Sequence, residues 1–248
     1  MRPLPLLLGL LLLAPPALAQ GNLLDQGKNL LQQRGGAGTA PLGGPANRNN
    51  LSVADMSGGL KDALKVGAQR TVGRIGKADG YLKDSAIHIP LPASLEKARS
   101  ALAMVGAAGM LDDLETRMNR AAEKAAPKAL EIFTTAISKM SIEDAKGILN
   151  GPQDAATQYF KRTTTEPLST AFRPVIDKTL SEAGAVQTYN AMKTKAGPLA
   201  DLGGFDLNGF ALEKALAGLF HYIATEEAAI RTDPAKRSTE LLKKVFGP

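Results

Sequence analysis

The stretch at residues 141–174 constrains the fold more than any other, because it places several helix starts and stops close together. Ser141, with Asp144 three residues later, begins a helix in the manner of a capping box, with Asp in place of Glu. Asn-Gly-Pro at 150–152 then stops this helix, since Gly can adopt the left-handed conformation at a helix end and Pro cannot continue a helix. Three threonines at 163–165 end the next helix. The stretch therefore predicts short helices joined at tight corners.

The chain after Leu51 shows the apolar spacing of three and four residues that is typical of amphipathic helices. The fold class that we predict is all-α, a single-domain multi-helix bundle with short connections and little or no β structure. Residues 87–92 are expected to be extended, because positions before Pro avoid the helical region. Helices are predicted at residues 57–75 (with Ser57 as the N-cap), 93–105, 110–126, 128–139, 142–149, 153–163, 166–183, 185–195, 207–231 and 235–245.

The first 19 residues have the pattern of a secretory signal peptide. Arg2 gives a positive start, residues 6–13 form an apolar run, and Ala-Leu-Ala at 17–19 is a small-x-small cleavage site. The apolar run is shorter than the about 20 residues that a membrane-spanning helix needs. We therefore expect cleavage after Ala19 and a mature periplasmic chain that begins at Gln20 and does not span a membrane.

Residues 20–50 are rich in Gly, Asn and Pro, and much of this stretch has too little apolar surface to offset the entropy cost of ordering. We interpret it as a flexible tether. The helical domain is then expected at residues 51–248.

The composition argues against several classes of function. The chain has no Cys, which excludes disulfides and thiol chemistry. Its net charge of +6 is spread along the chain, and aromatic residues make up only 4% with no Trp, so we expect no nucleic-acid partner. The two histidines, His88 and His221, lie far apart, so we predict no metal site and interpret both as structural. The chain has no phosphate-binding loop or dinucleotide fingerprint, and we predict no cofactor.

Several stretches resemble one family of bacterial secreted proteins. They read EDAKGILNGPQDAATQYFKRTT at 143–164, SGGLKDAL at 57–64, IHIPLP at 87–92, MNRAAE at 118–123 and ATEEAAIR at 224–231. These strings are similar to the family known as domain of unknown function 4197, and the resemblance extends over Leu51–Gly247. It implies a helical, exported bacterial domain. It implies no activity, because none is established for the family.

The helix expected after Pro152 carries a first candidate binding site. Asp154, Gln158 and Arg162 recur every four residues on one side, while Tyr159 lies on the opposite side among apolar residues. One interpretation is a solvated strip, whose charged pairs add little to stability. The other is the polar floor of a pocket that faces another helix, which the family resemblance favours.

A second candidate borders the apolar face of the helix predicted at 110–126. Glu115 and Asn119 lie one turn apart at this border, whereas Arg120 and Glu123 are expected to point elsewhere. A half-buried carboxylate seeks a cation. An ordinary boundary residue is the alternative interpretation.

Glu227 is the third candidate, because helical projection places it inside the apolar stripe of the helix predicted at 207–231. A buried carboxylate must be paired or protonated. Arg231, four residues later, is the local partner, and Arg120 or Arg162 is the long-range one. The alternative is that the helix has left the core here and Glu227 is solvated, but the resemblance favours a buried pair.

Together these observations favour binding over catalysis. We predict a ligand-binding or protein-interaction module of the cell envelope, whose partner is a small molecule or an envelope protein. One alternative is a metal-independent hydrolase or lyase that uses carboxylates such as Glu115, Asp154 or Glu227. The other is an envelope lipid binder that holds lipid between its helices.

Overall fold

A computed structural model of the chain describes residues 52–104, 106–196 and 205–232. All of them belong to one compact unit, Pro45–Pro248. A second unit, Met1–Gly44, lies outside the described residues, as do the predicted signal peptide, the predicted tether and the helix predicted at 235–245.

Within the described residues the chain is helical and contains no strand, which confirms the predicted all-α class. The helices are, in chain order, α2 (Val53–Ile75), α3 (Ala93–Lys97), α4 (Arg99–Met104), α5 (Gly109–Ala125), the 3-10 helix η2 (Ala126–Lys128), α6 (Ala129–Lys139), α7 (Ile142–Asn150), α8 (Ala155–Glu182), α9 (Ala185–Ala196) and α10 (Leu207–Thr232). The helix predicted at 93–105 is divided at Ala98, whose N–H bonds to the carbonyl of Leu95, only three residues back.

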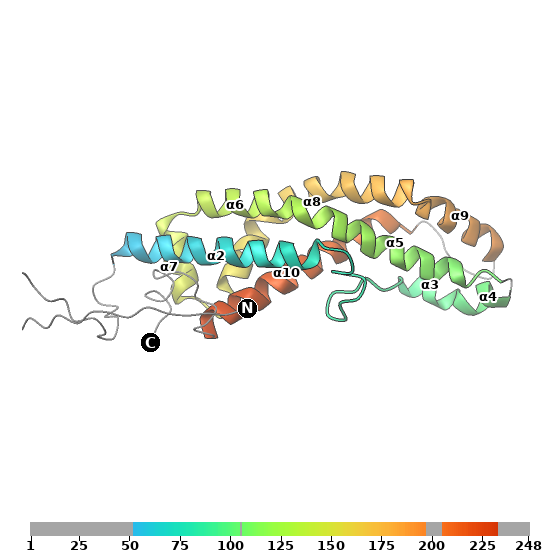
Figure 1. Ribbon diagram of the computed structural model, residues 1–248, viewed down its shortest axis with the longest axis horizontal. Helices are drawn as coiled ribbons and strands as arrows, with labels where there is room; N and C mark the ends of the chain where they lie inside the picture. The colour runs from blue at the N-terminus through green and yellow to red at the C-terminus, as the bar shows by residue number, and fades with distance from the viewer. Residues whose placement is uncertain (1–51, 105, 197–204, 233–248) are drawn as a thin grey trace, which may run out of the picture. The chain divides into compact units, whose positions relative to one another are not determined.

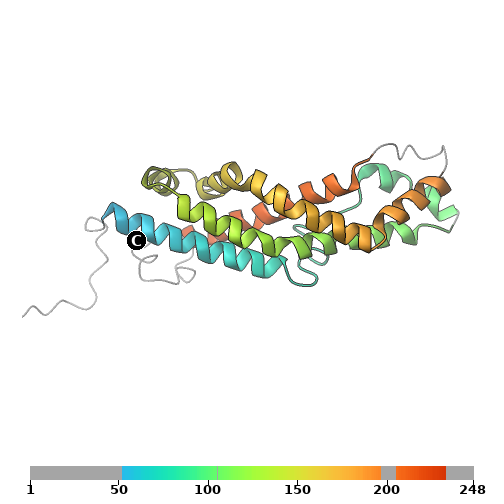
Figure 2. The same ribbon diagram turned by 90° about the horizontal axis from the view of Figure 1, so that it is seen from above.

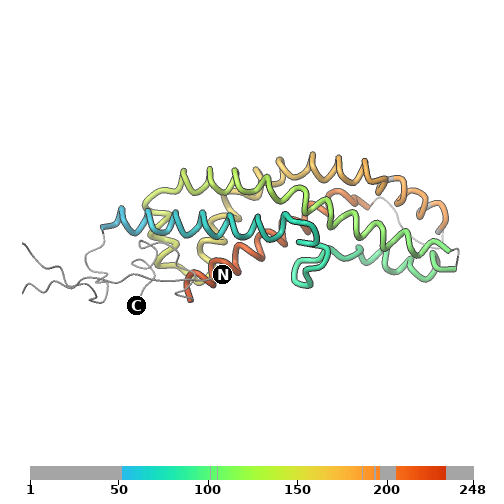
Figure 3. The backbone as a smooth tube through the Cα atoms, in the orientation of Figure 1, coloured from blue at the N-terminus to red at the C-terminus, as the bar shows by residue number. Residues whose placement is uncertain are grey.

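The long helices lie lengthwise against one another (Figure 1). α8 packs on α5, α6 and α10, and α10 also packs on α2. The short helix α7 runs across one end of these helices, and Figure 2 looks almost along its axis. The backbone trace in Figure 3 shows the segment 76–92 leaving the end of α2 and folding back beside the long helices before α3 begins.

Aromatic rings join α6, α8 and α10 in the core. Phe133 of α6 packs edge-on against Phe160 of α8, with 4.8 Å between ring centres, and against Phe220 of α10 at 6.4 Å. All three rings are buried. α5 contributes small residues, including Ala121 and Ala125, which are fully buried and allow its neighbours to approach closely.

α8 is one continuous helix, so the prediction of separate helices at 153–163 and 166–183 is wrong. Pro167 and Pro174 lie inside it and are exposed. A buried stripe recurs at every fourth position, and it consists of Phe160, Thr164, Leu168, Phe172, Ile176 and Leu180. Packing of this stripe outweighs the loss of two main-chain hydrogen bonds at the surface, where water can replace the missing donors.

α2 begins at Val53, so the prediction that Ser57 caps this helix is wrong. The cap is Ser52, whose hydroxyl accepts a hydrogen bond from the N–H of Asp55 at 3.0 Å. The carboxylate of Asp55 in turn accepts the N–H of Ser52 at 3.2 Å, which completes a capping box. The helix starts five residues earlier than predicted because Ser52 is an equally good cap. Ser57 therefore lies inside the helix, where it is buried.

α7 begins as predicted, with a capping box between Ser141 and Asp144. Its end differs from the prediction, because Gly151 is extended (φ −86°, ψ −176°) and not left-handed. Glycine is needed there for a steric reason instead. An added Cβ would lie 2.5 Å from the carbonyl oxygen of Gly147 and 2.9 Å from the Cβ of Ala155. The tight corner between α7 and α8 therefore depends on this residue.

Candidate functional site

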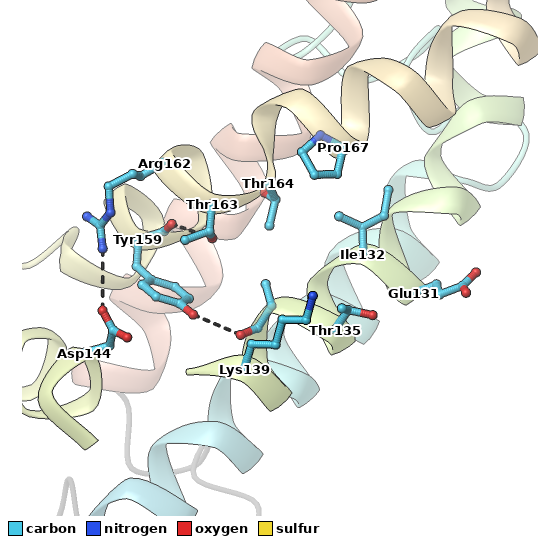
Figure 4. Close-up of a pocket in the computed structure, with 11 residues that line it drawn as sticks. Glu131, Ile132, Thr135, Lys139, Asp144, Tyr159, Arg162, Thr163, Thr164 and Pro167 are labelled. Atoms are coloured by element: carbon cyan, nitrogen blue, oxygen red, sulfur yellow. Dashed lines mark hydrogen bonds and ion pairs between the residues drawn. The ribbon is translucent and has the colours of Figure 1, made fainter. Parts of the chain in front are cut away.

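Two adjoining pockets lie where α6, α7 and α8 meet. The α6 pocket, about 480 Å³, lies between α6 and α8 (Figure 4), and the α7 pocket, about 430 Å³, lies between α7 and α8. Asp144, Tyr159 and Arg162 line both pockets and so form the ridge between them. Gln158 lines the α7 pocket, so three of the candidate residues meet at this place.

Tyr159 anchors the ridge to α6. Its side chain is buried, and its hydroxyl donates a hydrogen bond to the carbonyl of Ala136 at 2.9 Å. Burial, together with the nearby carboxylate of Asp144, raises the pKa of Tyr159. The phenol is therefore neutral at physiological pH and acts here as a fixed donor, not as a base.

Arg162 forms the exposed top of the ridge. Its side chain is 66% exposed, and its guanidinium lies 3.8 Å from Asp144 and 5.6 Å from the centre of the Tyr159 ring. Asp144 is mainly engaged in the cap of α7, and the hydrogen bonds from Ser141 hold the pKa of Asp144 below its usual value. The guanidinium is thus loosely held, and the contact with Asp144 is its one ion pair among the described residues (Figure 4).

Of the strip of Asp154, Gln158 and Arg162 that was interpreted as a pocket floor, Gln158 and Arg162 line the α7 pocket, whereas Asp154 lines neither pocket. Asp154 is exposed, and its carboxylate accepts a hydrogen bond from the amide of Gln158 at 2.8 Å, also at the surface. Arg162 pairs with Asp144 of α7 instead. Tyr159 lies about 100° further round the helix from Gln158, and it anchors α8 without carrying the polar strip into the core.

α6 contributes a polar strip to the α6 pocket that sequence reasoning missed. Glu131, Thr135 and Lys139 line the pocket at intervals of four residues, and all three are exposed. Figure 4 shows the side chain of Lys139 running along the pocket with its ammonium near Thr135, and Glu131 at the other end. Among the described residues neither Glu131 nor Lys139 forms an ion pair. The available signal was this i, i+4, i+8 spacing opposite the buried Phe133 face.

A main-chain carbonyl completes the α6 pocket. Thr163 and Pro167, four residues apart on α8, both line it. Because Pro167 has no N–H, the carbonyl of Thr163 has no helical hydrogen-bond donor. The hydroxyl of Thr163 donates to the carbonyl of Tyr159 at 2.8 Å. The pocket thus presents an acceptor that the helix leaves open.

Glu227 is buried and lies at the N-terminus of α8. Its carboxylate accepts hydrogen bonds from the N–H of Ala156 at 2.9 Å, from the N–H of Thr157 at 2.8 Å and from the Thr157 hydroxyl at 2.8 Å. These are donors that a helix start leaves without partners, and a negative charge there is favourable. Arg231 donates from both Nε and Nη2 to the same carboxylate, at 3.1 and 2.9 Å. The predicted buried pair of Glu227 with Arg231 is confirmed.

The same ion pair closes the corner between α7 and α8. Arg231 also donates to the carbonyl of Ile148, near the end of α7, at 2.9 Å. The small cavity lined by Glu227 and Arg231 holds only about 10 Å³. This space is at most that of one water molecule, about 10–15 Å³. Glu227 and Arg231 therefore belong to the fold and lie apart from both pockets.

A polar strip on α5 holds the segment 76–92 in place. Asn119 is fully buried, accepts the N–H of Ile89 and donates to its carbonyl, both at 2.9 Å. One turn later, Glu123 accepts the N–H groups of residues 81 and 82, both at 3.1 Å. The prediction that Glu123 points elsewhere is wrong, because it continues the four-residue spacing of Asn119 and is also buried.

Arg120 likewise belongs to this contact. It donates to Glu123 at 2.8 Å and to Asp79 at 2.6 Å. Arg120 therefore supplies the counter-charge of the buried Glu123 carboxylate, and it is not a partner of Glu227, as had been considered from the sequence.

Glu115, one turn before Asn119, binds His88. Nε2 of His88 lies 2.5 Å from the Glu115 carboxylate, and Nδ1 lies 2.9 Å from the carbonyl of Leu82. A carbonyl can only accept, so Nδ1 is the donor to Leu82 and Nε2 faces the Glu115 carboxylate. His88 contacts the backbone as predicted, and Glu115 holds it there.

Asp84 fastens the same segment to α2 and α10. Its carboxylate accepts the hydroxyl of Tyr222 at 2.6 Å and the guanidinium of Arg74 at 3.1 Å. Burial of the carboxyl opposes ionisation, but hydrogen bonds from Tyr222, from the N–H of Ala86 and from Arg74 outweigh it and hold the pKa of Asp84 below its usual value.

Tyr81 inserts between the segment and α10. It is fully buried and donates its hydroxyl to the carbonyl of Ala215 at 2.6 Å. Gly218 makes room for this ring, because an added Cβ would lie 2.7 Å from Tyr81 and 3.1 Å from Ile87.

The three candidate carboxylates do not come together. Glu115 contacts His88, Asp154 contacts Gln158 at the surface, and Glu227 caps α8. This arrangement provides no acid–base pair among them. Among the described residues no cluster of three or more His, Asp or Glu could hold a metal ion. In the same ranges, no helix has the length and apolar character to cross a membrane.

Comparison with known proteins gives one family. Residues 50–247 match the family model described as "Protein of unknown function (DUF4197)", and this range includes the residues of both pockets. Neither the curated proteins nor the solved structures contain a match to the chain. The family match covers well over half of the sequence, and the chain therefore belongs to the DUF4197 family of proteins of unknown function.

Proposed function

We propose that this protein is a binding module of the cell envelope that holds a small molecule in the α6 and α7 pockets. The pocket volumes of about 480 and 430 Å³ are within the range of about 300–1,000 Å³ that is common for small-molecule sites. The location in the envelope is supported by the signal-like pattern at residues 1–19.

One contrast carries the proposal, namely how the fold uses its polar side chains. The buried side chains of Asn119 and Glu227 have their hydrogen bonds satisfied within the fold. Arg162 and Lys139 are charged, line the α6 pocket and contribute little to holding the helices together. Charged groups that the fold leaves available around a concave surface suit ligand recognition.

The space between the helices gives less support to a lipid. The two cavities near Glu227, between α2, α8 and α10, each hold about 10 Å³. An acyl chain needs far more room than a single water, which takes about 10–15 Å³.

Native mass spectrometry of the chain purified from its own cells tests the proposal. We expect a retained small molecule that is released on denaturation. Thr135→Phe should remove it, because Thr135 lines the α6 pocket and is exposed, so the ring fills the pocket without entering the core. Gly73→Leu is the matched control on α2, where an added Cβ meets nothing within 4 Å, and this variant should retain the ligand.

Two results would contradict the proposal. One is wild-type protein that carries no small molecule under conditions that preserve complexes. The other is a ligand that Thr135→Phe and Gly73→Leu retain equally, which would place the binding site elsewhere.

A further inference from the structure

We propose that the ligand of the α6 pocket is a short peptide with free ends, whose C-terminal carboxylate lies at Lys139 and Arg162 and whose N-terminal ammonium lies at Glu131. This inference rests on the proposed function and names the chemical class of its ligand. It is carried by the order of charges along the pocket.

Both cations of the α6 pocket come from one end of it, and Glu131 comes from the other. Lys139 and Arg162 lie toward the α7 end, together with the carboxylate of Asp144, which Ser141 already engages in the cap of α7, and Glu131 lies at the opposite end (Figure 4). Among the described residues, Lys139 and Glu131 make no ion pair, and Arg162 has only the 3.8 Å contact with Asp144. A ligand that is negative at one end and positive at the other therefore matches both ends of the pocket.

The backbone spacing of Glu131 and Lys139 gives an upper bound on the ligand length, because the ammonium of Lys139 lies back toward Thr135 (Figure 4). Glu131 and Lys139 are eight residues apart on one helix, which corresponds to about 12 Å along its axis at about 1.5 Å per residue. An extended peptide covers about 3.3–3.6 Å per residue, so three or four residues span this distance.

The middle of the pocket suits a peptide backbone. The open carbonyl of Thr163 can accept a peptide N–H, and the exposed hydroxyl of Thr135 can donate or accept. Ile132, Ala136 and Pro167 supply apolar surface beside these groups. The pocket therefore fits small aliphatic side chains, such as those of alanine.

Tetra-alanine with free ends, its N-acetylated form and its C-amidated form are the probes. Titration into the full chain should show the free peptide binding best, with each cap weakening binding by about fivefold, the upper range for an exposed ion pair. Lys139→Met should weaken the free and acetylated peptides by about fivefold and leave the C-amide unchanged. Glu131→Gln should weaken the free peptide and the C-amide and leave the acetylated peptide unchanged.

Lys161→Met is the control, because Lys161 is exposed on α8 next to Arg162 but lines neither pocket. It should change none of the three affinities. Since all of the substituted side chains are exposed, loss of folding does not complicate the comparison.

The outcomes separate this inference from the proposed function. Equal binding of free and capped peptides, or equal loss of all three in Lys139→Met, would overturn end recognition. If no peptide binds but native mass spectrometry finds a non-peptide ligand that Thr135→Phe removes, the inference fails and the proposed function stands. If no peptide binds and no ligand is retained, both fail.

Discussion

Replacement of Glu227 by Gln should strongly destabilise the protein, although the two side chains differ only in one oxygen that becomes an NH₂ group. The effect should exceed that of the other carboxylate-to-amide substitutions that we consider. Glu227 accepts hydrogen bonds from two backbone N–H groups, one hydroxyl and both ends of the Arg231 guanidinium. In Glu227→Gln one oxygen becomes an NH₂ group, which faces a donor in either orientation. Arg231, only 14% exposed, loses its counter-charge.

The size of the effect follows from these losses. A hydrogen bond to a charged group contributes about 1.5–3 kcal/mol, and breaking a buried ion pair costs about 3–5 kcal/mol. Because the two terms overlap, we expect a loss of about 3–5 kcal/mol in the free energy of unfolding. For a domain of this size the melting temperature should then fall by about 10 °C.

Urea denaturation and thermal melting of Glu227→Gln and Glu226→Gln, side by side, measure the effect. Glu226 is the adjacent carboxylate, and it has only a 3.6 Å contact with Arg70. Its substitution should cost less than about 1 kcal/mol. Equal, small effects of the two substitutions would refute the assignment of Glu227 as the cap of α8.

Further expectations concern the surface, the segment 76–92 and its contacts, each measured by urea denaturation. Arg162→Ala should change the free energy of unfolding by no more than about 0.5 kcal/mol, because the side chain is exposed, and a loss of several kcal/mol would show that it is buried in solution. Asn119→Ala should lower the free energy of unfolding by about 2–3 kcal/mol, because the N–H and carbonyl of Ile89 lose their buried partner. An unchanged urea midpoint would mean that Asn119 does not bind Ile89 in solution. Gly218→Ala should destabilise by about 1–3 kcal/mol, since the methyl group meets Tyr81 at 2.7 Å, whereas Gly73→Ala should stabilise slightly; the opposite order would contradict the packing. The pKa of Asp84 is lowered in the folded state, so its contribution is present above the unfolded value of about 3.9 and is lost as the pH falls below it. The free energy of unfolding should therefore fall less between pH 5 and pH 3 in Asp84→Asn than in wild type, and parallel curves would exclude this role.

Local signals in the sequence were sufficient for much of the helical framework. The capping box of Ser141 with Asp144 gave the start of α7, because both partners lie within one turn. The pairing of Glu227 with Arg231 was likewise predictable, since four residues on one helix bring the two side chains together. What the sequence could not give was the second set of partners of Glu227, the N–H groups at 156 and 157, because they are about 70 positions away in the chain.

The wrong predictions have a common physical origin. Tertiary packing outweighs the local sequence signals for helix ends and surface positions. Three threonines and Pro167 are strong local signals for a helix end, yet the buried residues at every fourth position carry α8 through them. The α5 strip was missed in part for the same reason. Glu123 is polar and lies three residues after Arg120, a spacing that suggests a surface ion pair. Its carboxylate instead binds backbone N–H groups of the segment 76–92, whose position a sequence pattern cannot predict.

The pockets show a similar limit. Tyr159 and Arg162 were singled out from one helix, but Lys139 and Glu131 were not, because the α6 strip gains its meaning only when α8 lies opposite to it. The free carbonyl of Thr163 also depends on a continuous α8, since a helix that ended at 163–165 would have left several carbonyls open anyway.

The central claim is that the pockets at α6, α7 and α8 bind the ligand, and amide chemical-shift mapping by NMR tests it most directly. The ¹⁵N-labelled chain would be titrated with the small-molecule fraction extracted from the envelope of its own cells. We predict shifts concentrated at residues 131–139, at Asp144 and at residues 159–167, and weakened in Thr135→Phe. Shifts that gather instead around Asn119 or Glu227, or a spectrum that does not change, would contradict the account.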